Sequence, residues 1–326
     1  MLSVIVPLLN EKDSLQELVA RILEVEAAMG HPGIEIWLID DGSSDGSWET
    51  IESLAHEHGS VRGIRFRRNF GKAAALAAGF SKAQGDVIIS LDADLQDDPK
   101  EIPRLLQKLS EGFDVVSGWK QTRHDPWHKR WPSRIFNMLL RSFTGLALHD
   151  FNCGFKAYRK TVVEEIDLYG EMHRFIPVLA AARGFRVAEL AVQHHARLHG
   201  FSKYGLSRIP KGFMDLLTVF FLTRFRYRPQ HLLGGIGGAV GTVGLLMLTG
   251  LILSWLWSRI AQHEAPMQLH EGALFYISIL MVMVGVQLLS LGLLAELVVA
   301  HSLFRRPSYS IADQTQSKSS SPPYGA

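Results

Sequence analysis

Two long stretches near the C-terminal end contain no charged residue, and they constrain the fold of this chain more than any other feature. Residues 232–257 lack Asp, Glu, Lys and Arg over 26 positions, and residues 273–295 lack them over 23 positions. A helix needs about 20 apolar residues to cross the hydrocarbon core of a bilayer. A soluble protein would have to bury both helices on every side. We therefore predict two transmembrane helices.

The basic residues around these stretches predict where the chain termini lie. Three arginines within residues 224–228 precede the first stretch, and Arg305 and Arg306 follow the second. The connection between the stretches has Arg259 as its one basic residue apart from histidines. Because basic residues concentrate in cytoplasmic segments, both termini are expected in the cytoplasm.

Five glycines cluster in the first half of the first stretch. They are Gly234, Gly235, Gly237, Gly238 and Gly241. Small residues let transmembrane helices approach closely, within one subunit or between subunits. Glycines also occur in flexible spans without a packing role, so the sequence leaves both interpretations open.

Between residues 3 and 117, strand-like and helix-like patterns alternate. We predict strands at residues 3–8, 34–39, 61–66, 87–91 and 115–117. Helices are predicted from the capping-box pair Ser14 and Glu17 onward and at residues 44–58, 72–84 and 99–109. Strands that alternate with helices indicate a mostly parallel, doubly wound α/β sheet. Such sheets bind ligands at the carboxyl ends of their strands.

The strongest chemical signal is Asp92-Ala93-Asp94, which follows the fourth predicted strand. Mg²⁺ and Mn²⁺ prefer oxygen ligands and commonly take one or two carboxylates together with phosphate oxygens. Asp94 is the natural direct ligand, and Gln96 could add an amide oxygen. The same pattern alone is common in solvated acidic turns, and it is the position after a buried strand that favours a metal site.

Two further polar clusters lie at predicted element ends. Asp40 and Asp41 follow the second strand, where a carboxylate can accept hydrogen bonds from a base or a ribose hydroxyl. Residues 43–45 can cap the next helix, and the two roles are compatible. Residues 67–72 precede an Ala-rich helix, and basic residues and amides at a helix start suit an anion such as a diphosphate. A solvated turn is the alternative interpretation of that segment.

Composition excludes several classes of protein. A formal net charge of +2 argues against a nucleic-acid-binding protein. Cys153 is the single cysteine, which excludes an internal disulfide and argues against a zinc cluster. Residues 205–226 mix arginine and lysine with apolar residues, as in a helix that lies on a membrane surface. Residues 313–326 are rich in Ser, Pro and Gln and are expected to be disordered.

Taken together, the motifs resemble a known family of enzymes. The matching segments are Val4–Glu11, Asp40–Asp45, Asn69–Lys72 and Asp92–Gln96, in that order. They are similar to the inverting glycosyltransferases of family 2, which have a GT-A fold. Asp150–Lys156, Arg197–Tyr204 and the two C-terminal spans further resemble the polyprenyl-phosphate glycosyltransferases. That group includes dolichol-phosphate mannose synthase and bacterial enzymes that load glucose or aminoarabinose onto undecaprenyl phosphate.

The resemblance implies roles for matching positions. It implies nucleotide binding at Pro7, Asn10, Glu11, Asp40, Asp41, Lys72, Asp92, Ala93 and Lys203. It implies Mg²⁺ or Mn²⁺ as cofactor, held by Asp92, Asp94 and Gln96. It implies catalytic roles for Asp94, Asp150 and Arg197. It implies acceptor-phosphate binding at Arg123, Lys129, Arg130 and Ser133. Leu8 or Leu9 stands where many relatives have an aromatic residue, which puts base stacking in doubt.

The implied reaction moves one sugar from a nucleotide diphosphate to a lipid phosphate. A phosphate monoester has a second pKa of about 6, so the nucleophile needs positioning more than a general base. Arginines such as Arg123 and Arg130 can grip it with two hydrogen bonds each. The alternative is that this basic segment is a patch drawn to anionic lipid. Backside attack would invert the anomeric centre. UDP is the expected nucleotide, with GDP left open.

The predicted organisation has four parts. They are a glycosyltransferase domain at residues 1–204, interfacial helices at 205–229, two transmembrane helices at 230–304 and a cytoplasmic tail at 305–326. We expect an integral protein of a bacterial inner membrane with its catalytic domain in the cytoplasm. The expected partners are a nucleotide sugar, polyprenyl phosphate, the membrane and further copies of the chain, such as in a tetramer, and no nucleic acid.

Three other functions compete with this prediction. A processive polysaccharide synthase would share the early motifs, but the Gln-x-x-Arg-Trp type signature is missing after Ala188. A non-catalytic scaffold that binds nucleotide sugars would not need the acidic pair. A flippase would need a wider conduit than two spans provide.

Overall fold

The computed structural model describes residues 1–120, 138, 140–141, 145–194, 218, 221, 225, 228–261, 269 and 272–303. The chain divides into two units, residues 1–220 and residues 221–326. Between residues 121 and 144 the structure describes Met138, Leu140 and Arg141, which are helical. Most of the predicted interfacial segment and all of the predicted tail lie outside the described residues.

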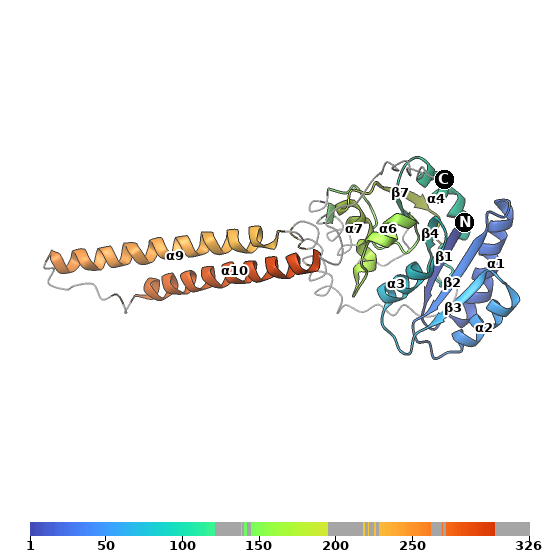
Figure 1. The fold of residues 1–326 in the computed structure, drawn as a ribbon, viewed down its shortest axis with the longest axis horizontal. Coiled ribbons are helices and arrows are strands. Elements are labelled where there is room, and N and C mark those ends of the chain that lie inside the picture. The colour runs from blue at the N-terminus through green and yellow to red at the C-terminus, as the bar shows by residue number, and fades with distance from the viewer. Residues whose placement is uncertain are drawn as a thin grey trace, which may run out of the picture. The chain divides into compact units, whose positions relative to one another are not determined.

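Seven strands of the first unit form one sheet, in the order β3-β2-β1-β4-β6-β5-β7 (Figure 1). The strands are β1 (Leu2–Leu8), β2 (Ile34–Asp40), β3 (Val61–Arg65), β4 (Val87–Ser90), β5 (Val115–Lys120), β6 (Lys156–Arg159) and β7 (Val187–Val192). β6 is antiparallel to both of its neighbours, β4 and β5, and the other neighbouring pairs are parallel. The predicted, mostly parallel sheet is confirmed, and β6 and β7 add two strands that the sequence patterns did not reveal.

Helices cover both faces of this sheet. They are α1 (Lys12–Ala28), α2 (Ser47–Glu57), α3 (Lys72–Lys82), α4 (Ile102–Ser110), α6 (Lys160–Glu165) and α7 (Ile176–Ala182), with 3₁₀ turns η1 (Pro99–Glu101) and η2 (Met172–Phe175). On β1, Val4 and Val6 belong to a core formed with α1, α2 and α4. Ile5, between them, belongs to a second core formed with α3, α6 and α7. Because both faces are buried, the central strands are apolar almost throughout.

Two helix starts differ from the predicted ones. α1 begins at Lys12, and the capping-box prediction at Ser14 is wrong: this buried hydroxyl donates to the Glu11 carbonyl (2.8 Å) from inside the first turn. α2 begins at Ser47 because Gly46 adopts a left-handed conformation with φ of 91°. Residues 43–45 were predicted to cap this helix. Of these, Asp45 bonds to its start, since the Asp45 carboxylate accepts the Ser47 backbone N–H (3.0 Å).

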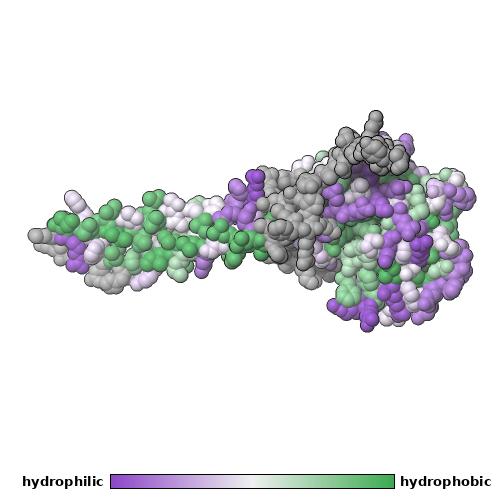
Figure 2. All heavy atoms as spheres, viewed as in Figure 1, coloured by the Kyte–Doolittle hydropathy of each residue, from purple (hydrophilic) through white to green (hydrophobic). Residues whose placement is uncertain are grey.

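The second unit contains two long apolar helices, α9 (Pro229–Ile260) and α10 (Ala273–Leu303). Their most apolar windows have mean hydropathies of 2.0 and 2.3. Only 11% and 17% of the residues in these windows are buried. Figure 2 shows apolar side chains over most of their visible surface. Helices this apolar and this exposed match membrane spans better than core helices of a soluble protein.

Glycines bring the backbones of α9 and α10 into contact. A Cβ atom on Gly285 would lie 2.6 Å from the Cα atom of Gly241 and 2.7 Å from the carbonyl oxygen of Gly237. Gly244 is similarly close to the backbone of α10, whereas Gly235 has no such neighbour within 4 Å. Two of the five clustered glycines, Gly237 and Gly241, therefore pack against α10 within one chain.

The open end of this hairpin is joined by a polar contact. The backbone N–H of Gln230, in the first turn of α9, donates to the carboxylate of Glu296 on α10 (3.3 Å). The first amides of a helix have no partner within the helix and lie at the positive end of its dipole. A carboxylate from the neighbouring helix satisfies one of them.

We predict that Gly285→Val destabilises the hairpin, because a larger side chain must push the two backbones apart. Overpacking of this kind costs about 1–3 kcal/mol. The readout is the fraction of full-length protein in detergent that stays monodisperse on size-exclusion chromatography after heating. Gly250→Val is the matched control, because Gly250 has no atom within 4 Å of its would-be Cβ. Equal heat resistance of the two variants would contradict the packing role.

Candidate active site

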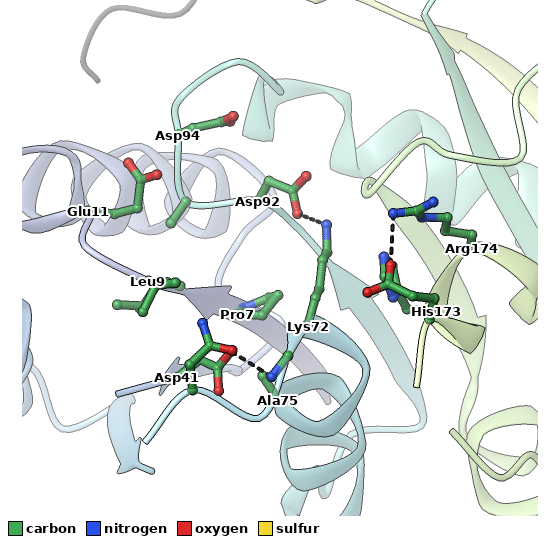
Figure 3. Close-up of a pocket in the computed structure, with 15 residues that line it drawn as sticks. Pro7, Leu9, Glu11, Asp41, Lys72, Ala75, Asp92, Asp94, His173 and Arg174 are labelled. Atoms are coloured by element: carbon green, nitrogen blue, oxygen red, sulfur yellow. Dashed lines mark hydrogen bonds and ion pairs between the residues drawn. The ribbon is translucent and has the colours of Figure 1, made fainter. Parts of the chain in front are cut away.

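A cleft of about 350 Å³ opens at the carboxyl ends of the central strands (Figure 3). Chain segments that follow β1, β2, β3 and β4 contribute to it. β2 pairs with one side of β1 and β4 with the other, so the strand order reverses at this point of the sheet. Doubly wound sheets bind ligands in such a crevice. Of the predicted site residues, the cleft is lined by Pro7, Glu11, Asp41, Lys72, Asp92, Ala93 and Asp94.

Asn10 and Asp40, also predicted to bind nucleotide, do not line this cleft. Asn10 has a φ of 55° and connects two loops, since its amide oxygen accepts the Ser44 N–H (2.9 Å) and its own N–H donates to the Ser43 hydroxyl (2.8 Å). Asp40 is fully buried and accepts the Ser43 N–H (2.8 Å), with Arg65 at 3.7 Å. Both residues shape the loop that presents Asp41.

Gln96 and Asp150 also lie outside the lining of the cleft. Gln96 donates its backbone N–H to the Asp94 carboxylate (3.2 Å). Asp150 is buried and accepts the N–H of Asn152 (3.0 Å). The remaining predicted residues lie outside the described part of the chain: Arg123, Lys129, Arg130, Ser133, Arg197 and Lys203.

Asp41 fixes the segment that leads into α3. Its two carboxylate oxygens accept the backbone N–H groups of Phe70 (2.7 Å) and Gly71 (2.9 Å). Gly71 has a φ of 96°, a conformation that favours glycine, and α3 begins at the next residue. The N-terminal end of α3 is therefore held at the cleft, where Gly71 and Lys72 line it. Helix N-termini attract anions.

An ion pair between Lys72 and Asp92 crosses the cleft from the start of α3 to the end of β4. The two side chains are 30% and 29% exposed, so solvent still reaches the pair. Burial raises the pKa of Asp92, but the charges of Lys72 and Lys120 lower it by more, to about 2. Asp92 is therefore an anion at every physiological pH.

Behind this pair, a buried carboxylate connects three chain segments. Asp97 has no exposed surface, and Lys120, at the end of β5, approaches it to 3.0 Å. His194, just beyond β7, approaches the same oxygen to 3.4 Å and pairs with Asp97 through a backbone bridge. Burial lowers the pKa of Lys120, but Asp97 raises it by more, so this lysine stays charged. The loop that carries Asp92 and Asp94 is thereby held against β5 and β7.

The acidic residues of the cleft fit a divalent cation that a second ligand completes. Asp92 and Asp94 extend from one loop toward the same side of the cleft (Figure 3). Within the described residues, no group of three or more His, Cys, Asp or Glu side chains is arranged to hold a metal alone. Mg²⁺ and Mn²⁺ bind readily to one or two carboxylates together with phosphate oxygens and water. The two aspartates suit that mode of binding.

The structure adds three polar residues to the cleft that the sequence motifs did not predict: Glu171, His173 and Arg174. They belong to η2 or directly precede it. Arg174 donates to the Glu171 carboxylate (2.8 Å). Burial, together with the charges of Lys72 and Arg174, lowers the pKa of His173 to about 2, so its imidazole is neutral. The only available sequence signal was a short polar run ahead of the apolar helix α7.

The Asp92 carboxylate packs directly against the backbone of Gly154. A Cβ atom at Gly154 would lie 2.5 and 2.6 Å from the two carboxylate oxygens of Asp92. The glycine cannot retreat easily, because its carbonyl accepts the Ser90 hydroxyl (2.7 Å) and the preceding Cys153 carbonyl accepts the Lys156 ammonium. Burial lowers the pKa of Lys156, which is almost fully enclosed. Close approach, and not an unusual φ, therefore explains the glycine.

Comparison with known proteins identifies similar sequences over nearly the whole chain. The family model for glycosyl transferase family 2 matches residues 3–167. Dodecaprenyl-phosphate galacturonate synthase from Rhizobium johnstonii is 35% identical over 327 residues, covering 97% of this chain and 94% of the relative. Undecaprenyl-phosphate 4-deoxy-4-formamido-L-arabinose transferase from Pseudomonas aeruginosa is 38% identical over 297 residues, covering 91% and 84%.

A crystal structure with the same fold is glucosyl-3-phosphoglycerate synthase from Mycobacterium tuberculosis with Mn²⁺, uridine-diphosphate-glucose and phosphoglyceric acid. Its TM-score is 0.52 at 18% identity, over 68% of this chain and 79% of that chain. At this identity the likeness establishes the fold alone. The GT-A fold that the sequence motifs predicted is confirmed.

We predict that Gly154→Ala lowers the thermal stability of the full-length protein, because the new methyl group must displace the Asp92 carboxylate or the Cys153–Gly154 backbone. The expected cost is about 1–3 kcal/mol, as for other overpacked sites. Gly59→Ala is the matched control, since its would-be Cβ has no atom within 4 Å. Tryptophan fluorescence during heating measures both variants. A Gly154→Ala protein that melts with the control would show that Asp92 does not need this close contact.

Proposed function

This chain belongs to glycosyl transferase family 2, in its polyprenyl-phosphate group, and from that premise we propose that it moves a single sugar from a nucleotide diphosphate to polyprenyl phosphate. The observation that carries the proposal is the cleft at the carboxyl ends of the central strands. There Lys72, at the start of α3, faces Asp92 and Asp94. Two apolar helices in the same chain support a lipid as the acceptor. Relatives that cover nearly the whole chain are named for transfer to dodecaprenyl or undecaprenyl phosphate.

The donor is proposed to lie across the cleft with its nucleoside near Pro7, Glu11 and Asp41. Its diphosphate then reaches the N-terminal end of α3, where backbone amides and Lys72 attract anions. Asp92 and Asp94 would hold Mg²⁺ or Mn²⁺ there, and the bound ion would supply Lewis-acid stabilisation of the leaving diphosphate. When the donor enters, the Lys72 ammonium moves from Asp92 to the diphosphate. UDP is the proposed nucleotide.

The acceptor supplies its own nucleophile. A lipid phosphate, with a second pKa of about 6, is largely ionised at neutral pH and attacks without a general base. Arg123, Lys129, Arg130 and Ser133 are proposed from the sequence to bind it. Arg197 and Lys203 are proposed in the same way to close over the diphosphate. Asp150, which is buried outside the cleft lining, is proposed to orient neighbouring groups. The phosphate attacks from the far side of the anomeric carbon and inverts its configuration.

The proposed setting is a bacterial inner membrane, with residues 1–204 as the catalytic domain and both termini in the cytoplasm. Residues 205–229 are proposed as interfacial helices, residues 230–304 as the membrane hairpin and residues 305–326 as the tail. A polyprenyl chain stays in the bilayer, so the enzyme must meet its acceptor at the membrane surface. A homo-oligomer such as a tetramer is part of the proposal.

The test is an assay of membranes that contain the full-length protein with radiolabelled nucleotide sugars, Mg²⁺ or Mn²⁺, and undecaprenyl phosphate. We expect label in a lipid that carries one sugar. Growing polymer would instead support the processive synthase that shares the early motifs. No transfer from any donor would contradict both enzymes and favour a scaffold.

We further predict that Asp94→Ala lowers transfer about 100-fold or more, because metal-assisted charge stabilisation contributes several kcal/mol to such reactions. The protein should still insert into membranes, since Asp94 is not part of the apolar core. Asp13→Ala is the control: it removes an exposed carboxylate in the first turn of α1, away from the cleft. Retained activity of Asp94→Ala would mean that the metal assignment is wrong.

A further inference from the structure

The η2 side of the cleft differs in chemistry from the rest of the site. In Figure 3, Pro7, Leu9 and Asp41 lie on one side of Lys72, and His173 and Arg174 lie on the other. The Lys72–Asp92 ion pair separates the two sides. A donor whose nucleoside occupies the first side, as in the proposed function, and whose diphosphate lies at Lys72 extends its sugar toward the second.

The charges of this second side cancel. Arg174 is paired with Glu171 at 2.8 Å, and their side chains are 21% and 48% exposed. The pair offers a hydrogen-bond acceptor and several donors without net charge. Sugar hydroxyls both donate and accept hydrogen bonds, so they match such a pair. A phosphate or a carboxylate would gain from Arg174 but would be opposed by Glu171.

His173 adds a buried polar atom that lacks a protein partner. Its Nδ1 atom is buried and makes no hydrogen bond to any residue that the structure describes. A neutral imidazole can donate from one ring nitrogen and accept at the other. Leaving a buried polar atom unpaired is costly. Because the His173 side chain lines the cleft, a small rotation of the imidazole would bring this atom to a ligand hydroxyl and remove that cost.

We infer that Glu171, His173 and Arg174 form the donor-sugar subsite and that this subsite takes an uncharged, polyhydroxylated sugar. The inference rests on the proposed function for the direction in which the donor lies. The residues differ from those proposed for nucleotide, metal and acceptor phosphate, so the subsite selects the sugar without holding the diphosphate. A uronic acid is disfavoured, because its carboxylate would lose hydration and gain no net opposite charge from the neutral Glu171–Arg174 pair.

The test compares binding of UDP with binding of UDP-sugars by the full-length protein in detergent, measured by isothermal titration calorimetry with Mn²⁺ present. The probes are UDP, uncharged UDP-sugars such as UDP-glucose, UDP-xylose and UDP-N-acetylglucosamine, and UDP-glucuronic acid. We expect the wild-type protein to bind at least one uncharged UDP-sugar more tightly than UDP and more tightly than UDP-glucuronic acid.

Variants then distinguish residues that bind the sugar from residues that bind the diphosphate. His173→Ala should weaken binding of the preferred UDP-sugar about three- to tenfold, as expected for one lost hydrogen bond, and leave UDP binding within about twofold. Glu171→Gln should narrow the preference over UDP-glucuronic acid, because it removes the opposing charge. His56→Ala, an exposed histidine of α2 outside the cleft, should change nothing.

Each result that differs from these expectations contradicts one part of the subsite assignment. Parallel loss of UDP and UDP-sugar binding in His173→Ala would place this side at the diphosphate, and unchanged binding of both would remove it from the site. Equal wild-type affinity for UDP and all uncharged UDP-sugars would contradict a sugar subsite. Tighter binding of UDP-glucuronic acid than of every uncharged UDP-sugar would contradict the preference for an uncharged sugar. A protein that binds neither UDP nor any UDP-sugar would overturn the UDP donor of the proposed function, and this assignment with it.

Discussion

The ion pair between Lys72 and Asp92 is the contact around which the catalytic unit is arranged. It joins the start of α3 to the end of β4, across the point where the strand order reverses. Asp41 holds the segment that presents Lys72, and Gly154 leaves room for the Asp92 carboxylate. Lys72 offsets the charge of the half-buried Asp92, and both side chains stay ionised. Each can therefore exchange its partner in the pair for a charged group of a ligand. A ligand that brings both phosphate and a divalent cation can satisfy the two partners separately.

The membrane hairpin solves a different physical problem with small residues. Lipid supplies no hydrophobic drive between two apolar helices, so close backbone packing must hold them together. Gly237, Gly241 and Gly285 provide that packing within one chain. The contact between Gln230 and Glu296 satisfies a helix-end amide where α9 begins. Together these contacts stabilise the α9–α10 hairpin. An apolar hairpin in the same chain as the catalytic unit suits an acceptor that cannot leave the bilayer.

Sequence patterns predicted strands β1 to β4 well, because β1 and β2 are buried on both faces and are apolar almost throughout. They missed β6, which has four residues, and β7, whose residues are mostly half-buried. Motifs identified the loops of the cleft and most of its polar side chains, but they did not distinguish Asp41, which lines the cleft, from its buried neighbour Asp40. His173 and Arg174 had no periodic or metal-ligand signal, because a 3₁₀ turn in a distant segment brings them to the site.

In the proposed donor complex, Asp92 and Asp94 share a divalent cation with the diphosphate, and the Lys72 ammonium moves from Asp92 to a phosphate oxygen. Anomalous scattering from crystals of the full-length protein with Mn²⁺ and UDP tests it directly. The account predicts a manganese peak between these aspartates and the diphosphate, with the Lys72 ammonium on a phosphate oxygen. UDP bound in the cleft with no manganese at the aspartates, and with the Lys72–Asp92 pair intact, would contradict it.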